Sequence, residues 1–203
     1  MAERDRVHWN QRYREAGEEE LAAPSRSLLA LETWLPIQGR ALDLAGGRGR
    51  HAFWLARRGL DVTLVDLSPV AVDWVAAQAA RSSLNVQAVT WDLDVEPVPE
   101  GPWSMVLINW YLNRSCLREL AVVLQPGGIL LVAHPTRRNL ERHPRPGAHH
   151  LLLTGELPRL VPGLEIVYFD EGWNEAGFHE ARLIARRRPT DSSPEFRSLP
   201  PAQ

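Results

Sequence analysis

Arg40-Ala-Leu-Asp-Leu-Ala-Gly-Gly-Arg-Gly-Arg-His51 is the part of the chain that says most about its architecture. A short apolar run, 41–45, leads into a turn rich in glycine, and a helical pattern over 50–58 follows at once. This order predicts a strand, a glycine turn and a helix. Because glycine leaves the main chain bare and a helix start offers free N–H groups, we expect a ligand to bind at this turn.

A second predicted strand, 61–66, indicates the kind of ligand. It ends in Asp66, whose carboxylate can accept hydrogen bonds from both hydroxyls of a ribose. Open α/β sheets bind their ligands at the carboxyl ends of parallel strands, where this carboxylate and the glycine turn would meet. The turn alone leaves two interpretations open, because residues 47–52 also fit the loose dinucleotide pattern G-x-G-x-x-A.

Composition excludes several classes of protein. The 203 residues suit one domain, and the net charge of −2 argues against a nucleic-acid partner held mainly by electrostatics. A charged start and the lack of a long apolar run lead us to expect a cytoplasmic protein with no membrane partner. All 23 basic residues are arginine, which rules out a Schiff base to pyridoxal phosphate, a P-loop and a tyrosine–lysine dehydrogenase pair.

The rest of the pattern predicts a Rossmann-like, three-layer α/β sandwich with a seven-stranded, mostly parallel sheet. Its further strands are expected at 84–89, 103–108, 129–133, 164–170 and 181–185, and its other helices at 5–17, after Pro24-Ser25, at 70–80, at 114–124 and around 153–160. A short turn from Gly172 to Gly177 makes the last strand antiparallel. We expect one domain, 1–188, and a disordered tail, 189–203, rich in proline and serine.

Taken together, the glycine turn, Asp66 and Pro126-Gly-Gly128 before an apolar strand resemble class I S-adenosylmethionine-dependent methyltransferases. The segment Trp9-Asn-Gln-Arg-Tyr13 is similar to the start of small methyltransferases related to tellurite-resistance and thiopurine enzymes. In that family an acidic residue opens the turn, as Asp43 does here. The family's usual first glycine is Ala45 in this chain, and we expect its φ to be negative.

The resemblance implies S-adenosylmethionine as cofactor. Asp66 would hold the ribose, Asp92 the adenine amino group, and Leu93 would donate through its backbone. Residues 1–38 would form a helical lid over the site. The cofactor-binding residues implied are Trp9, Arg12, Tyr13, Asp43, Ala45, Gly46, Gly47, Gly49, Arg50, Asp66, Leu67, Asp92, Leu93, Asn109 and Trp110.

The segment 134–150 is strongly basic, with four arginines, four histidines and Glu141 as its only acid. We expect it to lie over the substrate mouth, where guanidinium groups can bind an anion. The candidate substrate residues are Tyr111, Arg114, His134, Arg137 and Arg138. We assign no metal, because no carboxylate or thiolate completes the histidines at a recognisable spacing, and no catalytic base.

Some of these residues also have a purely structural interpretation. Trp9 and Tyr13 would then cover a sheet edge, Asp92 and Asp94 would be solvated, and the aromatic residues 110–111 would be core. The basic segment would be a solvated loop.

The function that follows is methyl transfer to a small-molecule acceptor. The absence of a convincing base favours a soft nucleophile such as a thiol, selenium or tellurium species. The alternatives are an NAD-dependent oxidoreductase and a non-catalytic module that binds S-adenosylmethionine. We expect a small-molecule substrate, no nucleic acid, and a monomer or homodimer.

Overall fold

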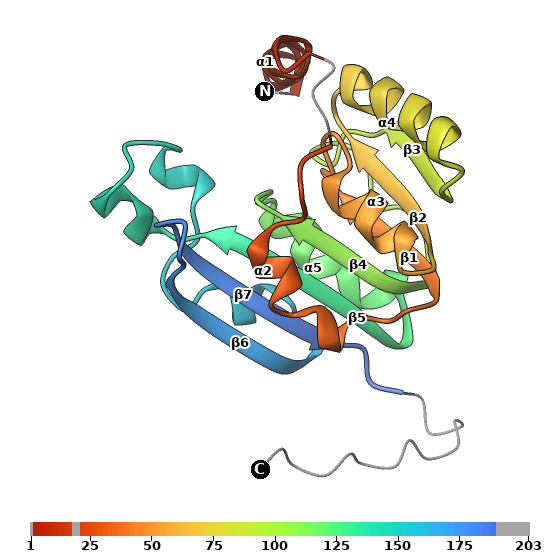
Figure 1. Cartoon of the computed structure of the whole chain (residues 1–203). Helices are drawn as coiled ribbons and strands as arrows, with labels where there is room; N and C mark the ends of the chain where they lie inside the picture. The colour runs from red at the N-terminus through yellow and green to blue at the C-terminus, as the bar shows by residue number, and fades with distance from the viewer. Residues whose placement is uncertain (1, 18–20, 190–203) are drawn as a thin grey trace.

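The computed structural model describes residues 2–17 and 21–189, so all of the predicted tail except Pro189 lies outside the described residues. Seven strands form one sheet in the order β3-β2-β1-β4-β5-β7-β6 (Figure 1). The elements are α1 (Ala2–Glu15), α2 (Arg26–Leu29), β1 (Gly39–Leu44), α3 (Arg50–Arg57), β2 (Leu60–Asp66), α4 (Pro69–Ser82), β3 (Val86–Thr90), β4 (Trp103–Asn109), α5 (Arg114–Val123), β5 (Leu124–Pro135), β6 (Glu165–Trp173) and β7 (His179–Arg186).

Strands β1 to β5 run parallel to one another, whereas β7 is antiparallel to both β5 and β6. The predicted fold class is therefore confirmed, including the antiparallel last strand. All five parallel strands end at the same edge of the sheet, so the loops that follow them gather there.

Alternation along the strands produces the three layers. In β1, Leu42 and Leu44 face a core that includes Leu117 and Leu120 of α5. Ala41 faces the opposite core, which includes residues of α3 and α4. Because successive side chains of a strand point to opposite faces, one short apolar run serves both cores.

Capping residues fix where two helices begin. Ser68 is the N-cap of α4, where its side chain accepts from the Ala71 N–H and Pro69 occupies the first turn. Asn113 caps α5 by accepting from the N–H groups of Ser115 and Cys116. Both helices thus start directly beyond the carboxyl edge of the sheet.

Two expected helices are shorter than their apolar pattern predicts. The helix after Ser25 ends at Leu29 and gives way to a 3₁₀ turn, Glu32–Trp34. The helix expected around 153–160 is only a 3₁₀ turn, Leu157–Leu160, because Gly155 is left-handed and Pro158 cannot continue a helix.

The expected lid, 1–38, consists of two parts with different surroundings. Helix α1 contacts α4 and the glycine turn, so it lies over the carboxyl edge. Leu28, Leu31 and Leu35 are instead buried in the core on the face of the sheet that α3 covers. Within 2–17 and 21–189, no helix has the length and apolarity needed to cross a bilayer.

The glycine turn differs from expectation at Ala45, whose φ is +53°. The prediction of a negative φ was wrong, because this position keeps the left-handed backbone for which the family uses glycine. A left-handed conformation costs an L-residue with a Cβ about 1–2 kcal/mol. Ala45 therefore holds local strain between β1 and α3.

Replacing Ala45 by glycine should raise the free energy of unfolding by about 0.5–1 kcal/mol, because relief of the strain exceeds the backbone entropy that glycine adds. Urea unfolding followed by circular dichroism would measure the change. Ala77→Gly, at an exposed position within α4, is the matched control and should lower stability by about 1 kcal/mol. Equal losses in both variants would contradict a strained Ala45.

Candidate active site

The carboxyl ends of the adjacent parallel strands β1 and β2 form the centre of the site. Asp66, at the end of β2, accepts the Gly47 N–H at 2.8 Å through Oδ2 and the Ser68 N–H at 2.9 Å through Oδ1. Burial raises the pKa of this carboxyl, although both backbone hydrogen bonds act in the opposite direction. Each oxygen keeps a second lone pair, so the carboxylate can still bind a ligand hydroxyl.

Asp43 is a second buried carboxyl, one residue before the end of β1. Its side chain is 1% exposed, and Oδ2 has no hydrogen-bond partner among the described residues. Burial first, and the charge of Asp66 second, raise the pKa of Asp43 to about 7, while Arg50 opposes the shift. A buried polar atom without a partner is costly, which indicates that a ligand completes it.

Two glycines of the turn lie where neighbouring side chains leave no room for a Cβ. A Cβ on Gly46 would lie 2.5 Å from Cδ1 of Leu64 and 2.8 Å from Oδ2 of Asp43. A Cβ on Gly47, which has a φ of +57°, would lie 2.7 Å from the Tyr13 hydroxyl. The turn therefore presents bare main chain next to both carboxyls.

Helix α1 covers this part of the site. Asn10 accepts a hydrogen bond from the Ser68 hydroxyl at 2.6 Å, and Trp9 stacks on Tyr13 at 5.7 Å between ring centroids. Burial and the charge of Asp66 raise the pKa of Tyr13, which keeps its hydroxyl protonated. Tyr13 thus lies against the glycine turn, with Trp9 stacked on it. Arg12 lies over the Trp9 ring on the same helix.

The loop after β3 supplies the other predicted acid. Asp92 is partly buried and accepts the Asp94 N–H at 3.0 Å, and the buried Leu93 accepts from the Asn113 side chain through its carbonyl. These bonds fix the loop after β3 against the start of α5.

Asn109 is the last residue of β4, and Trp110 follows it. Asn109 lies within 3.4 Å of the Ser25 hydroxyl, and Trp110 has a 43% exposed side chain, so this indole is not core. Tyr111 packs partly against the core, and its hydroxyl donates to Asp94 at 3.4 Å.

Glu180, at the start of β7, is a residue that the sequence analysis missed. It is 2% exposed, and its two oxygens accept from the Ser27 hydroxyl at 2.6 Å and the Trp110 indole N–H at 2.7 Å. The only signal in the sequence was an acidic residue at the beginning of an apolar strand. This carboxylate joins the segment before β1, the loop after β4 and β7.

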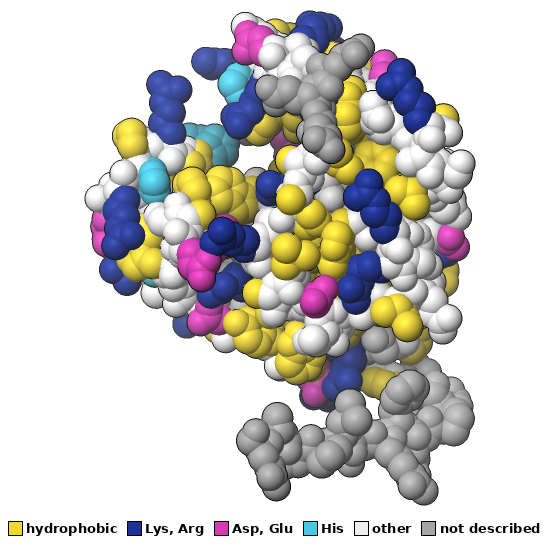
Figure 2. Space-filling model, in the orientation of Figure 1, with side chains coloured by type: hydrophobic (Ala, Val, Ile, Leu, Met, Phe, Trp, Pro, Cys, Tyr) yellow, Lys and Arg dark blue, Asp and Glu magenta, His cyan; other side chains and the backbone are white. Residues whose placement is uncertain are grey.

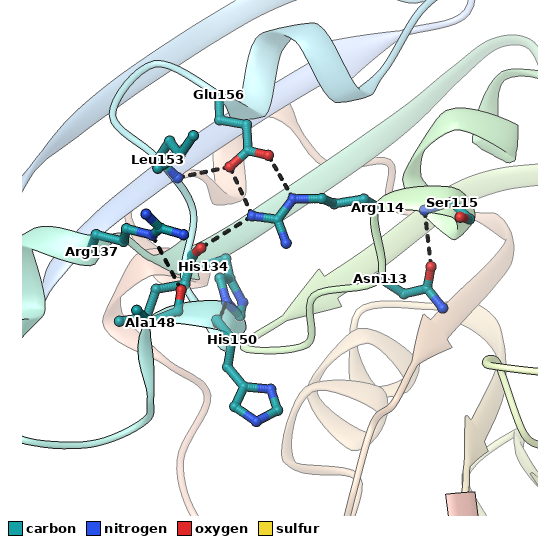
Figure 3. Close-up of polar contacts among 10 residues, drawn as sticks. Asn113, Arg114, Ser115, His134, Arg137, Ala148, His150, Leu153 and Glu156 are labelled. Carbon is teal, nitrogen blue, oxygen red and sulfur yellow. Dashed lines mark hydrogen bonds and ion pairs between the residues drawn. The ribbon is translucent and has the colours of Figure 1, made fainter. Parts of the chain in front are cut away.

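Three of the expected substrate residues, Arg114, His134 and Arg137, lie close together around the end of β5 (Figure 3). Tyr111 and Arg138 instead bond Asp94 and Glu141. Arg114 makes a two-pronged ion pair with Glu156, at 2.6 Å and 3.0 Å, and a further bond to the Leu151 carbonyl. This pairing raises the pKa of Arg114 and lowers that of Glu156. Most of the Arg114 fork is thus used inside the protein.

His134 lies beside this ion pair, at the end of β5. Its Nε2 lies 2.8 Å from the His150 carbonyl, which makes Nε2 the protonated nitrogen of a neutral ring. Burial lowers the pKa of His134 to about 4. Its Nδ1 is buried and has no hydrogen-bond partner among the described residues.

The basic segment is folded by specific contacts. Arg137 donates to the Ala148 carbonyl, Arg138 pairs with Glu141, and Arg142 lies 3.7 Å from the centre of the Trp173 ring. The interpretation of 134–150 as a merely solvated loop is therefore not favoured. In the described part of the chain, no three histidine, cysteine or acidic side chains lie close enough to hold a metal ion.

The residues present fit the cofactor implied by the resemblance. A cationic amino group suits the unpaired Asp43 oxygen, a ribose suits Asp66, and the bare turn at Gly46 and Gly47 admits a close backbone contact. Arg50, half buried near Asp43, adds a cation that suits a carboxylate.

Comparison with known proteins gives one family match: residues 41–128 fit the model described as a methyltransferase domain. A tRNA 5-carboxymethoxyuridine methyltransferase from Escherichia coli (strain K12) is 35% identical over 116 residues, which cover 53% of this chain and 44% of that protein. The chain thus spans less than half the length of this curated relative.

Solved structures show the same fold at low sequence identity. TehB from Haemophilus influenzae has a TM-score of 0.68 and 18% identity, covering 89% of this chain and 67% of that one. A geranyl diphosphate C-methyltransferase from Streptomyces coelicolor A3(2), with S-adenosyl-L-homocysteine bound, has a TM-score of 0.69 and 15% identity over 92% of this chain and 97% of that one.

These matches favour the methyltransferase interpretation of the glycine turn over the NAD-dependent one, which depended on the turn alone. The antiparallel β7 is also foreign to a dinucleotide-binding sheet of the all-parallel type. Residues 41–128 therefore match a methyltransferase domain, and the fold of the chain is that of solved S-adenosylmethionine-dependent methyltransferases.

Proposed function

We propose that this protein transfers the methyl group of S-adenosylmethionine to a small-molecule acceptor. The observation that carries the proposal is the buried pair Asp43 and Asp66 beside the bare turn at Gly47. S-Adenosylmethionine supplies an electrophilic methyl group on a sulfonium. The protein must therefore provide mainly position and the exclusion of water.

Different residues hold different parts of the cofactor in this proposal. Asp66 binds the ribose hydroxyls, Asp43 the amino group and Arg50 the carboxylate of the methionine part. Asp92 and the Leu93 backbone recognise adenine. Trp9 and Tyr13 on α1 exclude water from the crevice.

The acceptor is proposed to be a soft or already ionised nucleophile. His51 and His134, whose pKa values burial lowers to about 3 and about 4, are neutral at pH 7 but too weakly basic to take a proton from an ordinary alcohol. A thiolate, selenolate or reduced tellurium anion needs no such step. The arginines of 137–145 would attract these anions.

A tRNA acceptor is the second candidate, because the E. coli relative is named for one and the segment after β5 is rich in arginine. That relative does not support the expectation that this chain binds no nucleic acid. The chain covers only 44% of it, so the comparison does not decide between the two acceptors.

A panel assay that detects S-adenosylhomocysteine separates these candidates. We expect turnover with a small thiol, selenite reduced by thiol, or tellurite, and none with bulk tRNA. Turnover only with tRNA, weakening steeply as salt rises, would replace the small-molecule proposal. Binding of the cofactor without turnover on either class would indicate a non-catalytic module.

Asp66→Ala should weaken S-adenosylhomocysteine binding by at least about thirtyfold, because two hydrogen bonds to a charged group are lost. Isothermal titration calorimetry would measure the affinity. Asp73→Ala, at an exposed position on α4, is the control and should bind like the unchanged protein. Asp66→Asn keeps an acceptor for the Gly47 N–H, which separates loss of charge from loss of fold. A folded Asp66→Ala protein with full affinity would refute the ribose assignment.

Cofactor affinity should also depend on pH through Asp43. The raised pKa of about 7 means that the carboxyl is protonated below that pH, and this proton must leave before the carboxylate can pair with an ammonium group. Affinity is therefore lost as pH falls, by about tenfold between pH 8 and pH 6. Calorimetry at both pH values would show it.

Asp43→Asn is the matched variant for this pH test, because it keeps the shape of the side chain but cannot ionise. It should bind more weakly at pH 8 and show a flatter pH profile. If Asp43→Asn has the same pH profile of affinity as the unchanged protein, a group other than Asp43 causes the pH dependence.

A further inference from the structure

Trp110, the first residue after β4, has an unfavourable conformation for an ordinary residue. Its φ is +61°, and its side chain is 43% exposed. A left-handed backbone and an exposed indole both cost stability, and such strain persists mainly where function requires it. The surrounding structure must therefore hold this residue in place.

Three contacts do so. The Trp110 N–H donates to the Ala133 carbonyl at 2.9 Å, and the indole N–H donates to the buried Glu180 at 2.7 Å. The edge of Phe178 packs against the indole at 4.8 Å between ring centroids. The Ser27 hydroxyl donates to the other oxygen of Glu180, so a second bond holds this carboxylate in place beside the indole.

Trp110 lies at the edge of the sheet where the proposed function places the acceptor. Leu44 of β1 lies opposite Ile108 of β4, so the glycine turn and Trp110 both follow neighbouring strands at the carboxyl edge. Phe178 and His143, whose rings stack at 4.7 Å, extend the aromatic surface toward the basic segment.

The charge around this aromatic surface is positive. The segment 134–150 carries four arginines against one acid, and Arg50 is near enough to Glu180 for their charges to attract. In Figure 2, arginine and histidine side chains border the hollow between the upper part of the molecule and the lobe on the left, the places of α1 and of the segment after β5 in Figure 1.

We infer that the exposed face of Trp110 binds a planar ring, neutral or anionic, of the methyl acceptor, and that Glu180 is the residue that positions this indole. An indole face attracts flat rings and cations alike, but a cation would be repelled by the arginines. The inference rests on the proposed function, since it names the class of acceptor for the same site.

The test compares two carboxylates of similar size and equal charge, planar 2-naphthoate and non-planar decalin-2-carboxylate. Ligand-observed NMR titrations would use protein saturated with S-adenosylhomocysteine. We expect naphthoate to bind about three- to tenfold more tightly, the range that aromatic contacts provide. Trp34→Ala, at an exposed tryptophan in the turn before β1, should keep this preference.

Trp110→Phe and Trp110→Leu form the decisive pair, because both lose the bond to Glu180 but only phenylalanine keeps an aromatic face. The phenylalanine variant should retain most of the preference for naphthoate, and the leucine variant should lose it. Equal preference in the two variants, or no preference in the unchanged protein, would overturn the inference.

The role of Glu180 has a separate readout. Glu180→Gln keeps an acceptor for the indole N–H and should preserve the preference, whereas Glu180→Ala should reduce it in protein kept saturated with S-adenosylhomocysteine. If both behave alike, Glu180 does not position the indole. If the proposed function fails, the protein does not bind S-adenosylhomocysteine. That result is distinct from a lost preference for naphthoate.

Discussion

The carboxylate of Asp66 is the constraint on which the rest of the site depends. It binds the N–H of Gly47 after β1 and the N–H of Ser68 before α4, so one side chain fixes two loops at the carboxyl edge of the sheet. Burial first, and the charge of the nearby Asp66 second, raise the pKa of Asp43. A cationic ligand that also carries hydroxyls would relieve both buried acids.

The antiparallel β7 carries a buried carboxylate on the side proposed for the acceptor, as β2 does on the side proposed for the cofactor. Its first residues, His179 and Glu180, lie beside the end of β5, so a buried carboxylate reaches the loop after β4. His179 meanwhile bonds Thr136 of the basic segment. The hairpin of β6 and β7 therefore extends the sheet and also holds Trp110 and the basic segment in place.

The fold was predictable because its signals are local. The glycine turn, the Ser68 cap and the short link between β6 and β7 each act within a few residues. Glu180 and the Arg114–Glu156 pair were not predictable, because their partners are far away along the chain. Ala45 was misjudged for a different reason: the turn imposes its backbone conformation even where the sequence lacks glycine.

A crystal structure with S-adenosylhomocysteine would test the central claim most directly. The account predicts both ribose hydroxyls on Asp66, the amino group at the free oxygen of Asp43, and the methionine part along the main chain at Gly47. Electron density that places the ligand elsewhere, or a crevice in which Asp66 binds only Gly47 and Ser68, would contradict it.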